Sequence, residues 1–511
     1  MSRKFNARGY RTVALSGKDS EEKRQEAFER LAMEESDATQ EMQPLDFIFS
    51  RDILNEGVDI VEVNQVIMLR PTQSPIVFIQ QLGRGLRKAP GKEYVVILDF
   101  IGNYNNNFMI PVALSGDRSY NADVIRKYVI SGNSTIPGAS TVHFDEISKD
   151  KIFKSIDKIK GMKTLIKESY VSLKNRLGRV PLLYDFYENQ EIDPLVIIRE
   201  YKTYDAFMVA MEQGKYKNVL NEQEKLTLEY LSKTVLSGVR PDELVILSQL
   251  LHRDHIAVAD FIKEYQNTYG IEISTSRVKE AVQVLQGHFV SKEAEYCQID
   301  ILENDPAGMI KRLQSYTERL THIPFYTQVE DIIKVGIARY KEKYLPGIKS
   351  EDPFVLYEKY SRRDVSLLMN CGKDLSSIMY GMKRIENDVF IFITYHKEES
   401  QDEKNYVDGK PDYADAFEDN LIFKWDSQIG KGLDSSYMKD VLGADRKHLF
   451  VKKSDAETSF YYMGQFDVLE ARNAQKEDNR GRMQPITKVT MKMHHAVRED
   501  LLRYLQSHIT A

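Results

Sequence analysis

The chain has 511 residues, of which 42% are hydrophobic and 29% charged, with a formal net charge of −6. This composition excludes a disordered or collagen-like chain, and the length indicates about two to four domains. Two cysteines, Cys297 and Cys371, cannot form a disulfide framework, and no apolar run is long enough for a signal core or a membrane span. We therefore expect a cytoplasmic protein without membrane contact. Its net charge argues against coating nucleic acid by bulk charge and leaves room for a local basic groove.

Short apolar runs alternate with helical patterns in the first part of the chain. The runs are near-continuous, which is typical of parallel strands buried on both faces. This alternation predicts an open α/β layer over residues 1–121. The predicted strands are Leu45–Phe49, Val63–Leu69 and Tyr94–Phe100, and the predicted helices cover 21–33 and 75–86.

The most informative segment is QQLGRGLR, which presents Gln80, Gly83, Arg84 and Arg87 as Q-x-x-G-R-x-x-R. Arg84 and Arg87 are three residues apart, so on a helix they share one face and can point at one site. The guanidinium fork suits the oxygens of a phosphoryl group on which charge develops. Gln80, on the same face, can orient the nucleotide or its attacking water. We interpret the set as a nucleotide site rather than as two surface arginines beside a turn.

Two further segments stand before it in the chain. SRDILNEGVDI contains Gly57, which lets the backbone approach a ligand closely, and Asp59, which can accept from a ribose hydroxyl or hold an arginine. ALSGKDSEEKR places Ser16 and Gly17 at a strand-to-helix turn. In this order the three segments resemble the motifs of the second RecA-like lobe of superfamily 2 helicases. The resemblance implies that the Ser16–Gly17 turn contacts the nucleic-acid backbone.

The first lobe of that family carries G-x-x-x-x-G-K-[ST], whose amides cradle phosphates and whose hydroxyl serves Mg²⁺. No such string occurs in these 511 residues. The resemblance therefore implies a chain that begins inside the second lobe, without its first strand, and that binds ATP and Mg²⁺ only with a complementary first lobe. DEIS (145–148) and PDEL (241–244) come too late to be the family's acidic D-E-x-x box, and we interpret both as helix starts.

Later segments extend the resemblance over nearly the whole chain. FKWDSQ (423–428) and HLFVKKSD (448–455) resemble bacterial proteins in which a phospholipase-D-like nuclease and a helicase precede an uncharacterised C-terminal domain, often in restriction-type defence. The nuclease's H-x-K signature is absent, because His396 is followed directly by Lys397. The resemblance implies DNA and a missing helicase lobe, or nuclease–helicase fragment, as partners.

Residues 122–345 are predicted to form a helical accessory domain. Apolar residues recur every three or four positions over 152–177 and form one long stripe that stops at Gly178. Lysines crowd the same stretch, either as a solvated face or as a surface that follows DNA phosphates. The candidate phosphate contacts are Lys154, Lys158 and Lys163.

Residues 346–511 are predicted to form a mainly antiparallel β-barrel or sandwich. Trp425 and the aromatic residues of a neighbouring strand are interpreted as core, although aromatics in such a domain can also stack on unpaired bases. His494 and His495 have no carboxylate or cysteine at ligand spacing, so no metal site is predicted. The long acidic loop 398–419 leaves a magnesium-dependent nuclease as a weaker alternative.

Three functional hypotheses follow for this multidomain α/β, α and β chain. The first is the C-terminal motor lobe and accessory nucleic-acid-binding domains of an ATP-dependent DNA helicase or translocase, inactive as an ATPase without a separate first lobe. The second is a non-catalytic DNA- or partner-binding module left by truncation. The third is a nuclease in the C-terminal domain.

Overall fold

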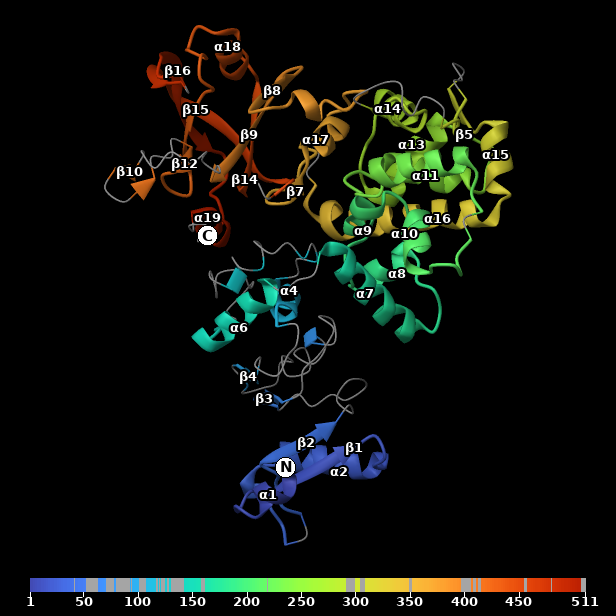
Figure 1. The fold of residues 1–511 in the computed structure, drawn as a ribbon, viewed down its shortest axis with the longest axis vertical. Helices are drawn as coiled ribbons and strands as arrows, with labels where there is room; N and C mark the ends of the chain where they lie inside the picture. The colour runs from blue at the N-terminus through green and yellow to red at the C-terminus, as the bar shows by residue number, and fades with distance from the viewer. Residues whose placement is uncertain are drawn as a thin grey trace. The chain divides into compact units, whose positions relative to one another are not determined.

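The chain forms two compact units in its computed structural model, one of residues 1–161 with 189–191 and one of residues 162–188 with 192–511 (Figure 1). Each unit is described by itself. The structure describes residues 1–40, 42–51, 63–69, 78–79, 92, 94–100, 107–115, 118, 120, 125, 128–129, 142–157, 161–217, 219–290, 299–303, 308–348, 352–396, 406–407, 410–411, 415–454, 457–478 and 480–506.

The first unit contains two pairs of parallel strands, as the alternating pattern predicts. Strand β1 pairs with β2, and β3 pairs with β4. The three predicted strands and the first predicted helix are confirmed, whereas most of the second helix, 75–86, lies outside the described residues. The elements are α1 (Ser2–Asn6), β1 (Thr12–Ser16), α2 (Glu21–Ala32), β2 (Phe47–Arg51), β3 (Gln65–Met68), β4 (Val96–Asp99), α4 (Met109–Ser115) and α6 (Glu146–Asp157).

Helix α2 packs on the β1–β2 pair. Its N-cap is Ser20, whose hydroxyl accepts from the Lys23 N–H at 3.3 Å and so satisfies one of the free amides of the first turn. Leu15, Ala27 and Leu45 form the buried centre of this contact. The helix therefore holds the end of β1 in place.

The prediction that the strands are buried on both faces is wrong for β3 and β4. Ile67 is 43% exposed, Val96 40% and Leu98 44%, so no described part of the chain buries this apolar face of the pair. In a doubly wound layer such a face is covered by the crossover helices. The crossover between β3 and β4 lies almost entirely outside the described residues.

The N-terminal half of the second unit is helical, as predicted, with one short antiparallel pair of strands, β5 and β6, that the pattern did not indicate. Its elements are α7 (Met162–Leu177), α8 (Leu183–Glu188), α9 (Pro194–Tyr201), α10 (Tyr204–Met211), α11 (Glu222–Thr234), α12 (Asp242–Leu250), β5 (His255–Ala257), α13 (Val258–Tyr269), α14 (Thr275–Leu285), β6 (Met309–Lys311), α15 (Gln314–Leu320) and α16 (Ile323–Arg339).

The long apolar stripe over 152–177 is carried by two helices rather than one. Helix α6 ends at Asp157, α7 begins at Met162, and the two compact units divide between Gly161 and Met162. The predicted end of the stripe is confirmed, because α7 stops at Leu177 and Gly178 follows with φ +68°, a backbone conformation that glycine adopts without strain. The apolar residues keep the same helical period before and after the break between α6 and α7. The sequence pattern therefore predicts one continuous helix.

The C-terminal half of the second unit contains one eight-stranded, mainly antiparallel sheet. The strand order is β12-β13-β16-β15-β14-β9-β8, with β7 on β15, and β9 and β14 are parallel. The mainly antiparallel β-structure predicted for this region is confirmed, and its closure into a barrel or sandwich stays a prediction. The bounds are β7 (Lys359–Tyr360), α17 (Arg362–Leu368), β8 (Met382–Ile385), β9 (Asp388–His396), β12 (Ala416–Phe417), β13 (Ile422–Asp426), α18 (Ser436–Leu442), β14 (Arg446–Ser454), β15 (Phe460–Glu477), β16 (Met483–Met493) and α19 (Glu499–Gln506).

Strand β15 is the longest element of the sheet and belongs to two parts of it. Its first residues pair with β7 and β14, and residues 466–477 pair with β16, with a register shift between Val468 and Glu470. The acidic loop 398–419 lies mostly outside the described residues. None of the described helices is long and apolar enough to cross a membrane.

Candidate nucleotide and nucleic-acid site

The turn between β1 and α2 is held by its own side chains. The Asp19 carboxylate accepts hydrogen bonds from the Ser16 N–H (2.7 Å) and the Ser16 hydroxyl (2.9 Å). Lys23 donates to the other oxygen of Asp19 at 2.5 Å. The bonds from Lys23 and from the Ser16 backbone lower the pKa of Asp19 to about 2. Arg24 adds a bond to the Gly17 carbonyl oxygen at 3.0 Å, so the turn is preorganised.

Within this turn Ser16 and Gly17 have different surroundings. The Ser16 hydroxyl already donates to Asp19 and is half-buried, so its first role is to shape the turn. Gly17 is exposed, and a Cβ added there would meet no atom within 4 Å. The open backbone at Gly17 can therefore admit a ligand, and contact with a nucleic-acid backbone stays a prediction for both residues.

The parallel pairing brings the starts of two motifs to one edge. Ser16 and Arg51 are register partners at the ends of β1 and β2. The Ser16–Gly17 turn follows β1 directly, whereas Gly57 and Asp59 come six and eight residues after Arg51 in the sequence, outside the described residues. The 80–87 segment lies in the crossover between β3 and β4. Ligands of open α/β sheets bind outside the carboxyl ends of the strands, and the turn after β1 and the segment after β2 both leave from such an end.

Most of the predicted nucleotide-site residues lie outside the described residues. Their nucleotide contacts and roles stay predictions that rest on the motif order. These residues are Gly57, Asp59, Gln80, Gly83, Arg84 and Arg87.

The predicted basic face is divided between two helices. Lys154 on α6 is exposed and pairs with Asp150 at 2.7 Å. Lys163 on α7 lies over the Tyr201 ring, 5.7 Å from its centroid. Lys158 lies outside the described residues. A single lysine-rich helix is therefore wrong, and phosphate contact by these lysines stays a prediction.

The core interpretation of the C-terminal aromatics is confirmed for Trp425. Its side chain is 5% exposed within the core cluster of the sheet, so it has no free face on which a base could stack. His494 has a carboxylate neighbour that the sequence did not indicate, because its Nε2 lies 3.2 Å from Asp467. No group of three or more His, Cys, Asp or Glu side chains within the described ranges could hold a metal ion.

Comparison with known proteins identifies a family for residues 1–89. Residues 1–89 match the family described as helicase conserved C-terminal domain. The putative ATP-dependent helicase IRC3 of Saccharomyces cerevisiae is 37% identical over 67 residues, which are 13% of this chain and 10% of that protein. The chain contains the C-terminal part of a superfamily 2 helicase. The match covers a small part of the yeast helicase, so activity of the whole protein does not follow from it.

The remainder of the chain matches two domains of unknown function, DUF8090 over residues 166–344 and DUF3427 over residues 354–505. A solved structure of the sulfur-binding and SRA domains of ScoMcrA with phosphorothioated DNA covers 57% of this chain and 92% of its own, at 9% identity and a TM-score of 0.18. That similarity is too low to indicate a common fold or ligand.

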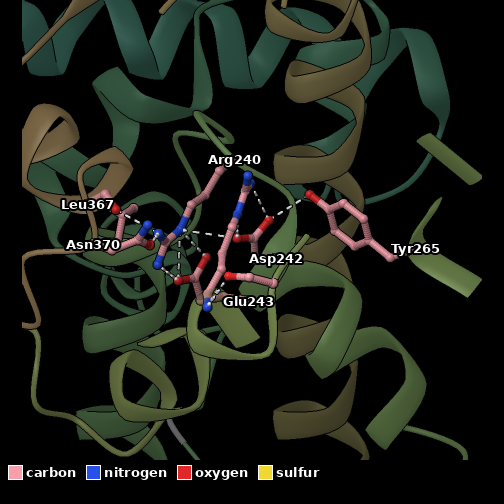
Figure 2. Close-up of polar contacts among 8 residues, drawn as sticks. Arg240, Asp242, Glu243, Tyr265, Leu367 and Asn370 are labelled. Carbon is pink, nitrogen blue, oxygen red and sulfur yellow. Dashed lines mark hydrogen bonds and ion pairs between the residues drawn. The ribbon is translucent and has the colours of Figure 1, made fainter. Parts of the chain in front are cut away.

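A buried ionic cluster joins the segments that match these two domains (Figure 2). Arg240 donates through Nε to Glu243 at 3.0 Å and through Nη1 to the Leu367 carbonyl oxygen and Asn370 Oδ1, both at 2.6 Å. Asp242 accepts from the Tyr265 hydroxyl at 2.6 Å. Figure 2 shows Arg240 between the two carboxylates on one side and the end of α17 on the other.

Burial and opposite charge act against each other in this cluster, with different outcomes at its two carboxylates. Burial acts to raise the pKa of Asp242, but Arg277, which donates to it at 2.6 Å, and Arg240 hold that pKa below its usual range. The pKa of Glu243 is raised, because burial outweighs the opposing charge of Arg240. The helix start predicted at PDEL is confirmed, but its carboxylates serve a buried ion network rather than an exposed helix end.

Sequence reasoning missed this cluster. Arg240 and Asn370 are 130 residues apart, and each is an ordinary polar residue in its local pattern. The one available signal is the density of charge in RPDEL, where an arginine and two acids stand beside an apolar helix. Charges in such a place are satisfied by partners that only the fold supplies.

Proposed function

We propose that this chain supplies the second motor lobe of an ATP-dependent DNA helicase or translocase, together with accessory domains that contact DNA. The observation that carries the proposal is the ordered set of motifs within the segment that matches the helicase C-terminal domain. The parallel β1–β2 pair supports it, because the Ser16–Gly17 turn leaves the carboxyl end of β1 and the segment that leads to Gly57 in the sequence follows the carboxyl end of β2.

In this proposal ATP is held between two lobes. Arg84 and Arg87 meet the γ-phosphoryl oxygens, and Gln80 orients the nucleotide or water. Gly57 lets the backbone approach, and Asp59 accepts from the ribose or holds an arginine. ATP supplies the phosphoryl chemistry, and the amide cradle and Mg²⁺ ligands come from a lobe carrying G-x-x-x-x-G-K-[ST], a string that these 511 residues lack.

The resemblance to nuclease–helicase proteins supports a role in defence against foreign DNA. The accessory part is large: the segments that match DUF8090 and DUF3427 span residues 166–344 and 354–505. In this proposal the accessory part binds DNA while the lobes open and close around ATP, and the closing step moves the motor along the strand.

The test is reconstitution of ATP hydrolysis. We expect the 511-residue chain alone to release no phosphate above background with duplex DNA. Phosphate release should appear when a purified first lobe carrying the P-loop is added. Phosphate release by the chain alone, abolished by Arg84→Ala, would show that it holds a complete site. A chain that binds DNA but stays inactive with every first lobe supplied would instead be a binding module.

A further inference from the structure

Strands β15 and β16 form a hairpin that continues past the neighbouring strand. The two strands pair from Phe466–Met493 to Glu477–Met483, whereas β13 pairs with β16 only as far as Asp426–Lys488. Beyond that point the loop after β13 contributes a bond from the Gly430 N–H to the Pro485 carbonyl oxygen at 2.9 Å. We name residues 472–488 the hairpin arm.

Hydrogen bonds to Asp478 connect the described residues at the tip of the hairpin arm. The Asp478 carboxylate accepts from the N–H groups of Arg480 (2.9 Å) and Arg482 (3.0 Å), and from the Arg482 guanidinium at 3.0 Å. Gly481 has φ +73°, so it occupies the left-handed position of a short hairpin loop. A preorganised tip loses little conformational entropy when it binds a partner.

The hairpin arm is strongly basic in an acidic protein. It contains five basic and two acidic residues, whereas the whole chain carries a net charge of −6. One of the two acids, Asp478, is already paired with Arg482. The remaining basic side chains are exposed and form no ion pair with any described residue. They are Arg472, Lys476, Arg480 and Lys488.

Two of these cations face each other directly. Arg472 and Lys488 are register partners on β15 and β16, so their side chains stand on the same face of the hairpin. Like charges directly opposite one another destabilise a strand pair. Asp426 on β13 is the other register partner of Lys488 and supplies one acid beside it. A phosphate bound at Arg472 and Lys488 would relieve the repulsion that remains between these two cations.

We propose that the hairpin arm binds in a groove of duplex DNA, with these four side chains on phosphates. A two-stranded ribbon fits the major groove of B-DNA, about 12 Å wide, whereas the major groove of A-form RNA is too narrow for side chains to read. Met483 is 62% exposed beside the tip and offers an apolar contact to base edges. This binding goes beyond the proposed motor function and requires neither ATP nor a first lobe.

The experiment measures binding of the full chain to a 20-base-pair duplex by fluorescence anisotropy over a salt series, without nucleotide. Each phosphate contact contributes about 0.9 to the slope of log K against log salt. Changing Arg472, Lys476, Arg480 and Lys488 together to alanine should flatten that slope by about two to four units. The matched control changes four exposed lysines outside the hairpin arm to alanine and should leave the slope within about one unit; they are Lys217, Lys279, Lys373 and Lys439.

A second variant keeps the charges and the fold. Exchanging Arg472→Lys and Lys488→Arg should retain the affinity and the slope, which separates loss of charge from loss of structure. An unchanged slope in the quadruple variant overturns the proposal. Equal losses on duplex DNA, single-stranded DNA and duplex RNA overturn it too, because a groove-bound ribbon distinguishes these forms. Neither result depends on whether ATP hydrolysis is reconstituted.

Discussion

Arg240 donates to Asn370 at 2.6 Å, and this bond joins the segment that matches DUF8090 to the segment that matches DUF3427. Both residues belong to one compact unit. A second arginine, Arg363 on α17, crosses in the opposite direction and donates to Thr234 at 3.0 Å. Each guanidinium pairs with a carboxylate of its own segment, Glu243 for Arg240 and Asp374 for Arg363, and completes its hydrogen bonds on neutral groups of the other segment. The two segments should therefore unfold together.

Arg240→Met should destabilise the second unit by about 3–5 kcal/mol, because it leaves Asp242 and Glu243 buried with less positive charge. The one tryptophan of the chain, Trp425, lies in the core of this unit and reports its unfolding by fluorescence in urea. Arg253→Ala removes an exposed pair with Glu264 and should cost at most about 1 kcal/mol. Equal midpoints for the two variants would contradict the role given to the cluster.

The buried carboxylate of Asp331 should make the stability of the fold fall as the pH rises. An ion-paired surface carboxylate has the opposite effect. Asp331 accepts from the N–H groups of Leu183 (2.7 Å) and Tyr184 (3.0 Å), the first residues of α8. Burial raises its pKa from 3.8 to about 6 despite these bonds. Folding therefore favours the protonated form, and this contribution is present below about pH 4 and is lost as the pH rises through about 6.

Asp331→Asn removes the titration. It keeps one acceptor oxygen, so one of the two N–H groups, which bind different carboxylate oxygens, loses its acceptor at every pH. Relative to the unmodified chain, the variant should gain roughly 2–3 kcal/mol of stability between pH 4 and pH 7, since one pKa unit corresponds to about 1.4 kcal/mol. Urea unfolding followed at Trp425 at several pH values measures this difference. Asp260→Asn, an exposed change on α13, is the control. Parallel stability curves for Asp331→Asn and the unmodified chain would refute the assignment.

Local sequence patterns predicted the helices and strands of this fold better than the tertiary contacts that these elements make. The strand in Tyr94–Phe100 and the helix end at Gly178 depend on neighbouring residues, so both were predicted. The division of the lysine-rich stripe at Gly161 was not, because the apolar period continues on both sides. The cluster around Arg240 depends on Asn370 and Leu367, which no local pattern connects with it.

Arg87 should control the rate of ATP hydrolysis by the reconstituted motor. When a first lobe has restored ATP hydrolysis, Arg87→Ala should lower kcat by about 10³–10⁵, the range measured for arginines that contact the transferred phosphoryl group. Phosphate release under saturating ATP and DNA measures the effect. Arg8→Ala, an exposed arginine of the same unit, should retain full activity. Activity that survives Arg87→Ala would show that the motif alignment is wrong.

The lysines of α6 and α7 predict a second, separate contribution to DNA affinity. Reversing Lys154, Lys158 and Lys163 to glutamate should flatten the salt slope by about two to three units if all three contact phosphates. Because Lys154 and Lys163 belong to different compact units, the single reversals should give additive changes of about one unit each. Reversing Lys154 also removes its exposed ion pair with Asp150, which is worth about 0.5 kcal/mol.

The effect of these lysines on the salt slope can be compared with that of the hairpin arm. The triple lysine variant and the quadruple hairpin variant should have additive effects on the slope, because they change different elements of the chain. Circular dichroism establishes that both variants remain folded. An unaltered slope in the folded triple variant would identify these lysines as a solvated face, since removing a phosphate contact must release fewer counterions when DNA binds.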